Sequence, residues 1–175
     1  MPTLVVVSGP PRTGKTTLAH AIARAVPCPA ISRDEIKEGM VHAQRGVFRA
    51  APGDSLTQST FPLFFDLLRM LLAEGVTVVA EAAFQDQRWR QGLEPLTDLA
   101  LLRVVQCHTK PAVAKARRRL NETAHAPFHG EEIEDWEWAF ASFDQLSIAA
   151  PSIDVDTTDG LVPNFEDIIE FVNRR

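Results

Sequence analysis

The sequence predicts an α/β fold in which a parallel sheet of about five strands carries helices on both faces. Segments with strand character alternate with segments of helical character along the whole chain. The strand segments are short apolar runs without polar alternation, a pattern typical of strands that are buried on both faces. The length of 175 residues suits one domain, so we expect residues 1–175 to fold as a single unit.

The first strand–helix units lie in the N-terminal quarter of the chain. Residues 4–7 form an apolar, β-branched run, and residues 15–26 repeat apolar side chains at helical spacing. The brief apolar step at residues 30–31 is followed by a capping-box pattern headed by Ser32. This pattern predicts a second helix that continues to about residue 45.

The alternation continues through the rest of the chain. The pattern predicts a long helix at residues 55–74, interrupted early by Pro62, and then a buried strand at residues 76–80. Two helical stretches separated by Pro95 follow at residues 86–94 and 97–102, and a strand follows at residues 102–106. The next segments are a basic helix at residues 111–121, a polar loop at residues 123–130 and an acidic helix at residues 131–143. The chain continues with a short strand at residues 153–155 and a helix at residues 165–173. The polar loop and its flanks, about residues 115–135, are expected to close over phosphates as a lid.

The strongest signal is a complete G-x-x-x-x-G-K-S/T motif between the first strand and the first helix. Its glycines let backbone N–H groups approach phosphate oxygens, and the helix N-terminus adds further donors. Lys15 supplies a charge for the β- and γ-phosphates, and the Thr16 hydroxyl is a ligand for Mg²⁺. The predicted nucleotide-binding residues are Gly9, Pro10, Pro11, Arg12, Thr13, Gly14, Lys15, Thr16 and Thr17.

Two carboxylates follow predicted strands and are expected to face the same crevice. Asp34, 19 residues after Lys15, accepts a proton from a substrate hydroxyl, holds Mg²⁺ through water, or only favours the helix dipole. Glu81 occupies the usual position of a Mg²⁺-binding acid, although Asp is commoner there. The alternative for Glu81 is an ordinary strand-end carboxylate in water. We predict Thr16 and Glu81 as the metal ligands.

Three consecutive arginines, Arg117, Arg118 and Arg119, lie on the predicted basic helix. A guanidinium group can bridge the equatorial oxygens of a phosphoryl group in its transition state. Successive helical residues point about 100° apart, so only one or two of the three can reach the site. The alternative is a solvated basic face. The predicted catalytic residues are Lys15, Asp34, Arg117 and Arg118.

Other conspicuous side chains are assigned to the structure rather than to chemistry. His125 and His129 have helical spacing, but no third ligand is near them in sequence, so we expect no zinc site. The aromatic residues Trp136, Trp138 and Phe140 are expected to pack in the core or the lid, and the alternative is that they line a substrate pocket.

Composition narrows the class of protein. The net charge of −5, from 18 Lys and Arg against 23 Asp and Glu, argues weakly against a protein that coats nucleic acid. Cys28 and Cys107 form no metal-binding pattern and are expected to be reduced thiols. The first residues lack the features of a signal peptide, and no apolar run is long enough to span a bilayer. We therefore expect a cytoplasmic protein without membrane contact.

The chain resembles the small P-loop kinases related to polynucleotide kinase, chloramphenicol phosphotransferase and the zeta toxins. The blocks that carry the resemblance are GPPRTGKT, ISRDEI, GVTVVAEAAF, HTKPAVAKARRRL with HAPFHG, and VDTTDG. The resemblance covers nearly the whole chain and implies the P-loop NTPase fold, the strand order 2-3-1-4-5, and a lid that carries catalytic arginines.

The resemblance also implies roles for individual residues. Lys15 and Thr16 match the residues that hold ATP and Mg²⁺, and Asp34 matches the acid that activates the acceptor hydroxyl. Arg117 and its neighbours match the lid arginines. The loop at residues 156–160 resembles the one that passes beside the adenine, so Asp159 and Gly160 join the predicted nucleotide-binding residues.

These observations together predict an ATP-dependent phosphotransferase that moves the γ-phosphoryl group of Mg–ATP to a hydroxyl of a small molecule. The segment SRDEIKEGM resembles part of the polynucleotide 5′-hydroxyl kinases, so a nucleic-acid acceptor is the second hypothesis. The third is a nucleotide-gated regulatory or toxin-like module. Asp34 and a basic lid favour the first, because a simple switch does not need such catalytic groups.

Overall fold

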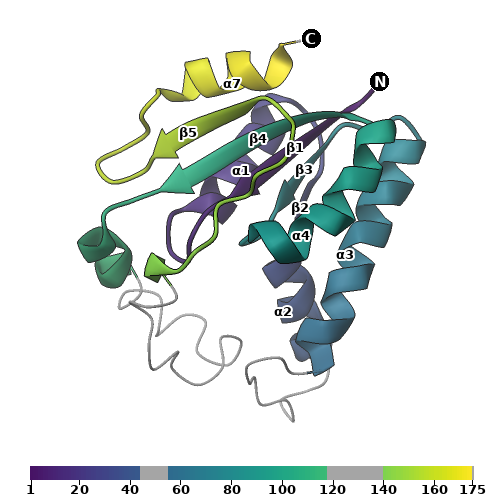
Figure 1. The fold of residues 1–175 in the computed structure, drawn as a ribbon, viewed down its shortest axis with the longest axis horizontal. Helices are drawn as coiled ribbons and strands as arrows, with labels where there is room; N and C mark the ends of the chain where they lie inside the picture. Colours follow the sequence, from purple (N-terminus) through teal and green to yellow (C-terminus); the bar gives the residue numbers. More distant parts are fainter. Residues whose placement is uncertain (44–54, 118–139, 175) are drawn as a thin grey trace.

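The computed structural model describes residues 1–43, 55–117 and 140–174. These residues contain a five-stranded sheet in the order β2-β3-β1-β4-β5, in which every neighbouring pair of strands is parallel. The strands are β1 (Thr3–Ser8), β2 (Ala30–Ser32), β3 (Val78–Glu81), β4 (Leu101–His108) and β5 (Ser152–Asp156). The predicted fold class and strand order are both confirmed, and Figure 1 shows the arrows pointing the same way.

Helices lie in the connections between the strands, and the last helix follows β5. They are α1 (Lys15–Ala25), α2 (Arg33–Ala43), α3 (Ser55–Ala73), α4 (Asp86–Leu93), the 3₁₀-helix η1 (Glu94–Asp98) and α7 (Phe165–Asn173). Residues 111–117 are also helical. None of the helices in the described ranges combines the length and the apolar character needed to cross a bilayer.

Alternate residues of β1 point to opposite faces of the sheet. Leu4 and Val6 pack with side chains of α3, α4 and η1, whereas Val5 and Val7 pack with α1 and α7. All four side chains are completely buried. Because both faces of the strand are covered, its sequence is continuously apolar, and the prediction of helices on both faces is confirmed.

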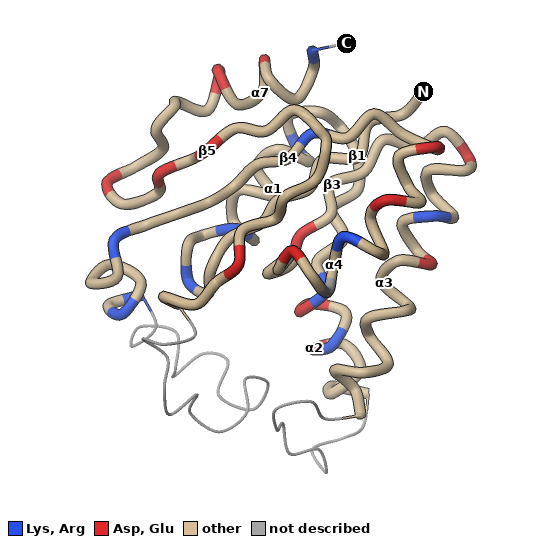
Figure 2. Tube along the Cα trace, viewed as in Figure 1, with Lys and Arg blue, Asp and Glu red and all other residues tan. Residues whose placement is uncertain are grey.

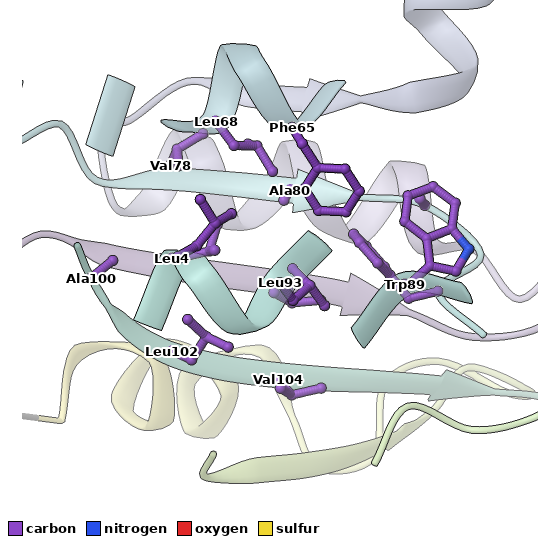
Figure 3. Packing of buried hydrophobic residues seen from close by; sticks show 14 of the residues in the cluster. Leu4, Phe65, Leu68, Val78, Ala80, Trp89, Leu93, Ala100, Leu102 and Val104 are labelled. Atoms are coloured by element: carbon purple, nitrogen blue, oxygen red, sulfur yellow. The ribbon is translucent and has the colours of Figure 1, made fainter. Parts of the chain in front are cut away.

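The core on the α3 and α4 face is rich in aromatic side chains (Figure 3). Ring centroids within this group lie 4.8–6.0 Å apart. Its members are Phe61, Phe64, Phe65, Phe84 and Trp89. A methyl group added at Gly92 of α4 would come within 2.3 Å of the Phe65 ring, so this glycine permits the close approach of α4 to α3.

The sequence was misleading at Pro62, because α3 continues through this residue without a break. Thr60 before it and Phe64 after it are both completely buried against the rest of the protein. Tertiary packing of this face therefore outweighs the lost backbone hydrogen bond that Pro62 imposes.

The prediction of a helix over residues 97–102 is also wrong at its C-terminal end. The 3₁₀-helix ends at Asp98, and β4 begins at Leu101. Leu101 and Leu102 are paired with Thr3 and Leu4 of β1, and this pairing decides their conformation. Residues 118–139 lie outside the described ranges, and with them Arg118, Arg119, His125, His129, Trp136, Trp138 and most of the predicted lid.

Candidate active site

The G-x-x-x-x-G-K-T motif forms the loop that joins β1 to α1, here called the P-loop (residues 9–16). Gly9 has φ 146°, and a Cβ at this position would lie 2.1 Å from the carbonyl oxygen of Cys107 in β4. Gly14 has φ 80° and caps α1, and among the described residues no side chain caps this helix. The first N–H groups of α1 are therefore directed at the site without a side-chain partner, as anion binding requires.

Side chains of the P-loop fold back onto the loop itself. The Lys15 ammonium donates a hydrogen bond to the Pro10 carbonyl at 2.9 Å, and the Thr13 hydroxyl donates to the same oxygen, also at 2.9 Å. Lys15 is only 9% exposed. An ammonium group has three donors, so Lys15 retains the capacity to bind a phosphate oxygen while it is held in this position.

Glu81, at the end of β3, is 2% exposed and lies beside the P-loop. Its Oε2 atom accepts a hydrogen bond from the Ser32 hydroxyl at 2.6 Å and from the Thr16 hydroxyl at 3.2 Å. Burial raises the pKa of Glu81 above its ordinary value, and the charge of Lys15 and the two hydroxyl groups oppose this shift. The structure thus brings together three separate parts of the sequence: the P-loop with Lys15 and Thr16, Ser32 of β2, and Glu81 of β3.

Asp34 lies in the first turn of α2, directly after β2. Its side chain is 56% exposed and pairs with the guanidinium of Arg33 at 3.1 Å. Ser32, two residues before Asp34, is the register partner of Glu81 in the sheet, and the negative charge of Asp34 adds to the raised pKa of Glu81. Asp34 therefore faces the same end of the sheet as Glu81, as the parallel topology predicts.

Two cations of α2 connect this region to α3. A guanidinium nitrogen of Arg33 donates to the Thr57 carbonyl at 3.4 Å, and the Lys37 ammonium donates to the Thr57 hydroxyl at 2.8 Å. The Nε atom of Arg33 is buried and has no hydrogen-bond partner within the described part of the chain. The predicted site did not include Arg33 or Lys37, although both stand within three residues of Asp34 in the sequence.

Arg117 contacts the P-loop from the segment that follows β4. Its Nη1 atom donates to the Arg12 carbonyl at 3.4 Å and to the Thr157 hydroxyl at 3.0 Å, and Nη2 donates to the Thr157 carbonyl. Figure 2 shows basic positions on both segments at this end of the sheet. In the described arrangement the guanidinium group directs three of its five N–H donors at oxygen atoms of the P-loop and of Thr157.

The loop after β5 contributes a residue that the sequence did not indicate. Thr157 is 6% exposed, and its hydroxyl donates to the Thr13 carbonyl of the P-loop at 2.8 Å. Asp159 and Gly160, which the sequence predicted here, are exposed two and three residues further along. Thr157 belongs to the loop at residues 156–160 that resembles the one beside the adenine, but no sequence pattern singles it out within that loop.

The oxygen atoms of Thr16 and Glu81 suit Mg²⁺. A hydroxyl and a carboxylate that already share a hydrogen bond are hard donors, and Mg²⁺ typically takes one or two carboxylates together with phosphate oxygens and water. Within the described ranges, no group of three or more His, Cys, Asp or Glu side chains is arranged to hold a metal ion. The donors present therefore fit Mg²⁺ rather than a metal held by protein ligands alone.

The sequence matches the model of a protein family described as an AAA domain, over residues 4–143. No curated protein matches it. Among solved structures, a protein of Chloroflexus aurantiacus that is provisionally named a kinase has a TM-score of 0.82 and 23% identity, with 98% of this chain and 96% of that chain covered.

Two further structures contain nucleotides or their analogues. Kti12 of Chaetomium thermophilum, solved with ADP-AlF3, has a TM-score of 0.68 and 17% identity. The match covers 99% of this chain and 100% of the Kti12 chain. The APS kinase CysC of Mycobacterium tuberculosis, solved with AMPPNP and APS, has a TM-score of 0.64 and 15% identity. The match covers 99% of this chain and 98% of the CysC chain. At these identities the likeness concerns the fold alone, and it confirms the predicted P-loop NTPase fold.

Proposed function

The chain belongs to the AAA-domain family and has a P-loop kinase-like fold, and from this premise we propose that it transfers the γ-phosphoryl group of ATP to a hydroxyl group of a small molecule. One observation carries the proposal: a cation, Lys15, and two carboxylates, Glu81 and Asp34, end or follow three neighbouring parallel strands, β1, β3 and β2, at the same edge of the sheet. A binding site for phosphate alone would not need the second, exposed carboxylate.

The phosphate side of the proposed site consists of the P-loop and the start of α1. The N–H groups of the loop and of the first helical turn bind phosphate oxygens, and Lys15 neutralises their charge. Thr16 and Glu81 would hold Mg²⁺, which supplies charge neutralisation at the phosphates when it is bound. The nucleotides in the Kti12 and CysC structures support a nucleotide as the ligand of this loop.

Asp34 is the proposed general base. Its carboxylate accepts the proton of the acceptor hydroxyl, whose oxygen forms the new bond to the γ-phosphorus. The bond between that phosphorus and the bridging oxygen breaks, and ADP leaves. Arg33 pairs with the Asp34 carboxylate in the first turn of α2.

Asp34→Asn tests the proposal, because it removes the base and preserves the size of the side chain. ATP consumption is measured against alcohols, nucleosides, sugars, antibiotics and 5′-hydroxyl oligonucleotides, and the variant is compared on the acceptor that responds. We expect transfer to fall about 10²- to 10⁴-fold while ATP binding is unchanged.

Glu35→Gln is the matched control, because Glu35 is the next carboxylate of the same helical turn and its Oε1 atom lies 2.7 Å from Nε2 of His20 on the surface. It should retain transfer. Undiminished transfer by Asp34→Asn would remove Asp34 from the mechanism, and an absence of ATP-dependent transfer to every acceptor in the screen would contradict the proposed function.

A further inference from the structure

We propose that Thr157 and Arg117 are positioning residues that orient two phosphate-binding amides of the P-loop, those of Thr13 and Gly14. This inference rests on the nucleotide-binding part of the proposed function and is independent of the acceptor and of phosphoryl transfer. It assigns Arg117 a structural contact with the loop, and it adds Thr157, which lies at the opposite end of the chain from the motif.

The Thr157 hydroxyl lies within hydrogen-bond distance of three other groups. It donates to the Thr13 carbonyl at 2.8 Å, with the His108 carbonyl as a second, longer neighbour at 3.3 Å. It also accepts a hydrogen bond from Arg117 at 3.0 Å. The Thr157 backbone N–H donates to the His108 carbonyl at 2.9 Å, which continues the β4–β5 pairing past the end of β5. The hydroxyl group is therefore held by the sheet and directed at the loop.

Arg117 holds the neighbouring carbonyl of the same loop. Its guanidinium donates to the Arg12 carbonyl at 3.4 Å and also bonds both the hydroxyl and the carbonyl of Thr157. The two successive carbonyls of the P-loop, at residues 12 and 13, thus accept hydrogen bonds from residues 105 and 144 positions away in the sequence. A planar guanidinium group presents its donors as a fixed fork, and so it can reach the Arg12 carbonyl and both oxygen atoms of Thr157 at once. The single nitrogen of an ammonium group lacks this fork.

Because the peptide group is planar, contacts that fix the direction of a carbonyl also fix the direction of the amide that follows it. In a trans peptide the C=O group and the following N–H group point in opposite directions. Because the carbonyls of Arg12 and Thr13 turn toward Arg117 and Thr157, the N–H groups of Thr13 and Gly14 point to the other side of the loop. Positive φ angles of 63° at Arg12 and 80° at Gly14 accompany this arrangement, and such conformations need external support in a non-glycine residue.

The test separates phosphate binding from other contributions by using inorganic tripolyphosphate as a probe beside ATP. Thr157→Val replaces the hydroxyl with a methyl group of similar size and leaves the buried Thr13 carbonyl without its donor. We expect affinity for both probes to fall about five- to tenfold, and Thr157→Ser to restore it to within about twofold.

Thr158→Val is the matched control. The Thr158 hydroxyl accepts from the Lys110 backbone N–H at 3.1 Å and lies 3.2 Å from the Thr109 hydroxyl, and it bonds no residue of the P-loop within the described ranges. This variant loses a hydroxyl of the same loop and should keep its tripolyphosphate affinity to within about twofold. A general loss of order in the loop would instead weaken both variants alike.

Arg117→Lys preserves the charge and removes the planar fork. We expect it to weaken tripolyphosphate binding about as much as Thr157→Val, and the double variant to weaken it little further, because both residues act on adjacent peptide groups. Unchanged affinity of Thr157→Val for both probes, or equal losses in Thr157→Val and Thr158→Val, would overturn the inference. A wild-type protein that binds ATP and transfers no phosphate would contradict the proposed function and leave this inference standing.

Discussion

The two sides of the candidate site differ in how firmly the fold holds their side chains. On the P-loop side, Lys15, Glu81 and Thr157 are each less than a tenth exposed and bonded to other parts of the chain. On the α2 side, the Asp34 side chain is 56% exposed and pairs with the residue beside it in sequence. The proposed phosphate-binding groups are thus held in place by the fold. The groups proposed to meet an acceptor are surface side chains, and fold likeness does not identify what they recognise.

The largest expected effect on stability comes from comparing two glycines, one on the P-loop side of the site and one on the α2 side. Gly9→Ala places a Cβ 2.1 Å from the Cys107 carbonyl at φ 146°, so we expect a loss of about 3 kcal/mol in the free energy of unfolding and no ATP binding. At Gly39 in α2, nothing lies within 4 Å of an added Cβ. Gly39→Ala should therefore stabilise the protein by about 0.5–1 kcal/mol.

Denaturant unfolding of both variants gives the measurement, with ATP binding as the second readout. Equal stability of Gly9→Ala and the wild-type protein would show that the P-loop side adjusts to a side chain, and the contrast between the two regions would then disappear.

The sequence indicated the parts of the site that are set by local order. Glycine spacing, an apolar strand and an amphipathic helix predicted the P-loop, and position after a strand predicted Asp34 and Glu81. The contacts that complete the site join residues far apart, such as Ser32 with Glu81 and Thr157 with Thr13, separated by 49 and 144 positions. No local pattern encodes them, because they depend on which strands become neighbours. That order, 2-3-1-4-5, came from family resemblance and not from periodicity.

The same reasoning explains the errors in the predicted elements. Local preference predicts a break at Pro62 and a helix over residues 97–102, and in both cases tertiary contacts decide the structure instead. Phe64 after Pro62 is completely buried, and Leu102 is paired with Leu4 in the sheet. Packing and sheet pairing override propensities that amount to a few kcal/mol at most.

An intermediate effect is expected at Glu81, on the firmly held side. Because burial raises its pKa, this carboxyl retains its proton in the folded protein at a pH where the unfolded chain has lost it. The folded state then binds more protons, so the free energy of unfolding falls as the pH rises from the ordinary value of 4.5, by up to about 1.4 kcal/mol per pH unit.

Glu81→Gln removes this titration, so its free energy of unfolding should decline less steeply than that of the wild-type protein above pH 4.5. Parallel denaturant unfolding curves from pH 4 to pH 7, without Mg²⁺ or nucleotide, measure the difference. Identical slopes for the two proteins would mean that Glu81 is not desolvated, and the P-loop side would then be no more enclosed than the α2 side.

The smallest effect is expected where the two sides meet on the surface. His20 of α1 and Glu35 of α2 approach to 2.7 Å, but their side chains are 37% and 44% exposed. Solvent and salt screen such a pair, so a double-mutant cycle with His20→Ala and Glu35→Gln should give a coupling energy below about 1 kcal/mol, and less at high salt. A coupling of about 2 kcal/mol or more would show that α2 is tied to α1 by this contact. Asp34 would then sit on a helix anchored to the P-loop side, and the exposure of its carboxylate would no longer mark a loosely held region.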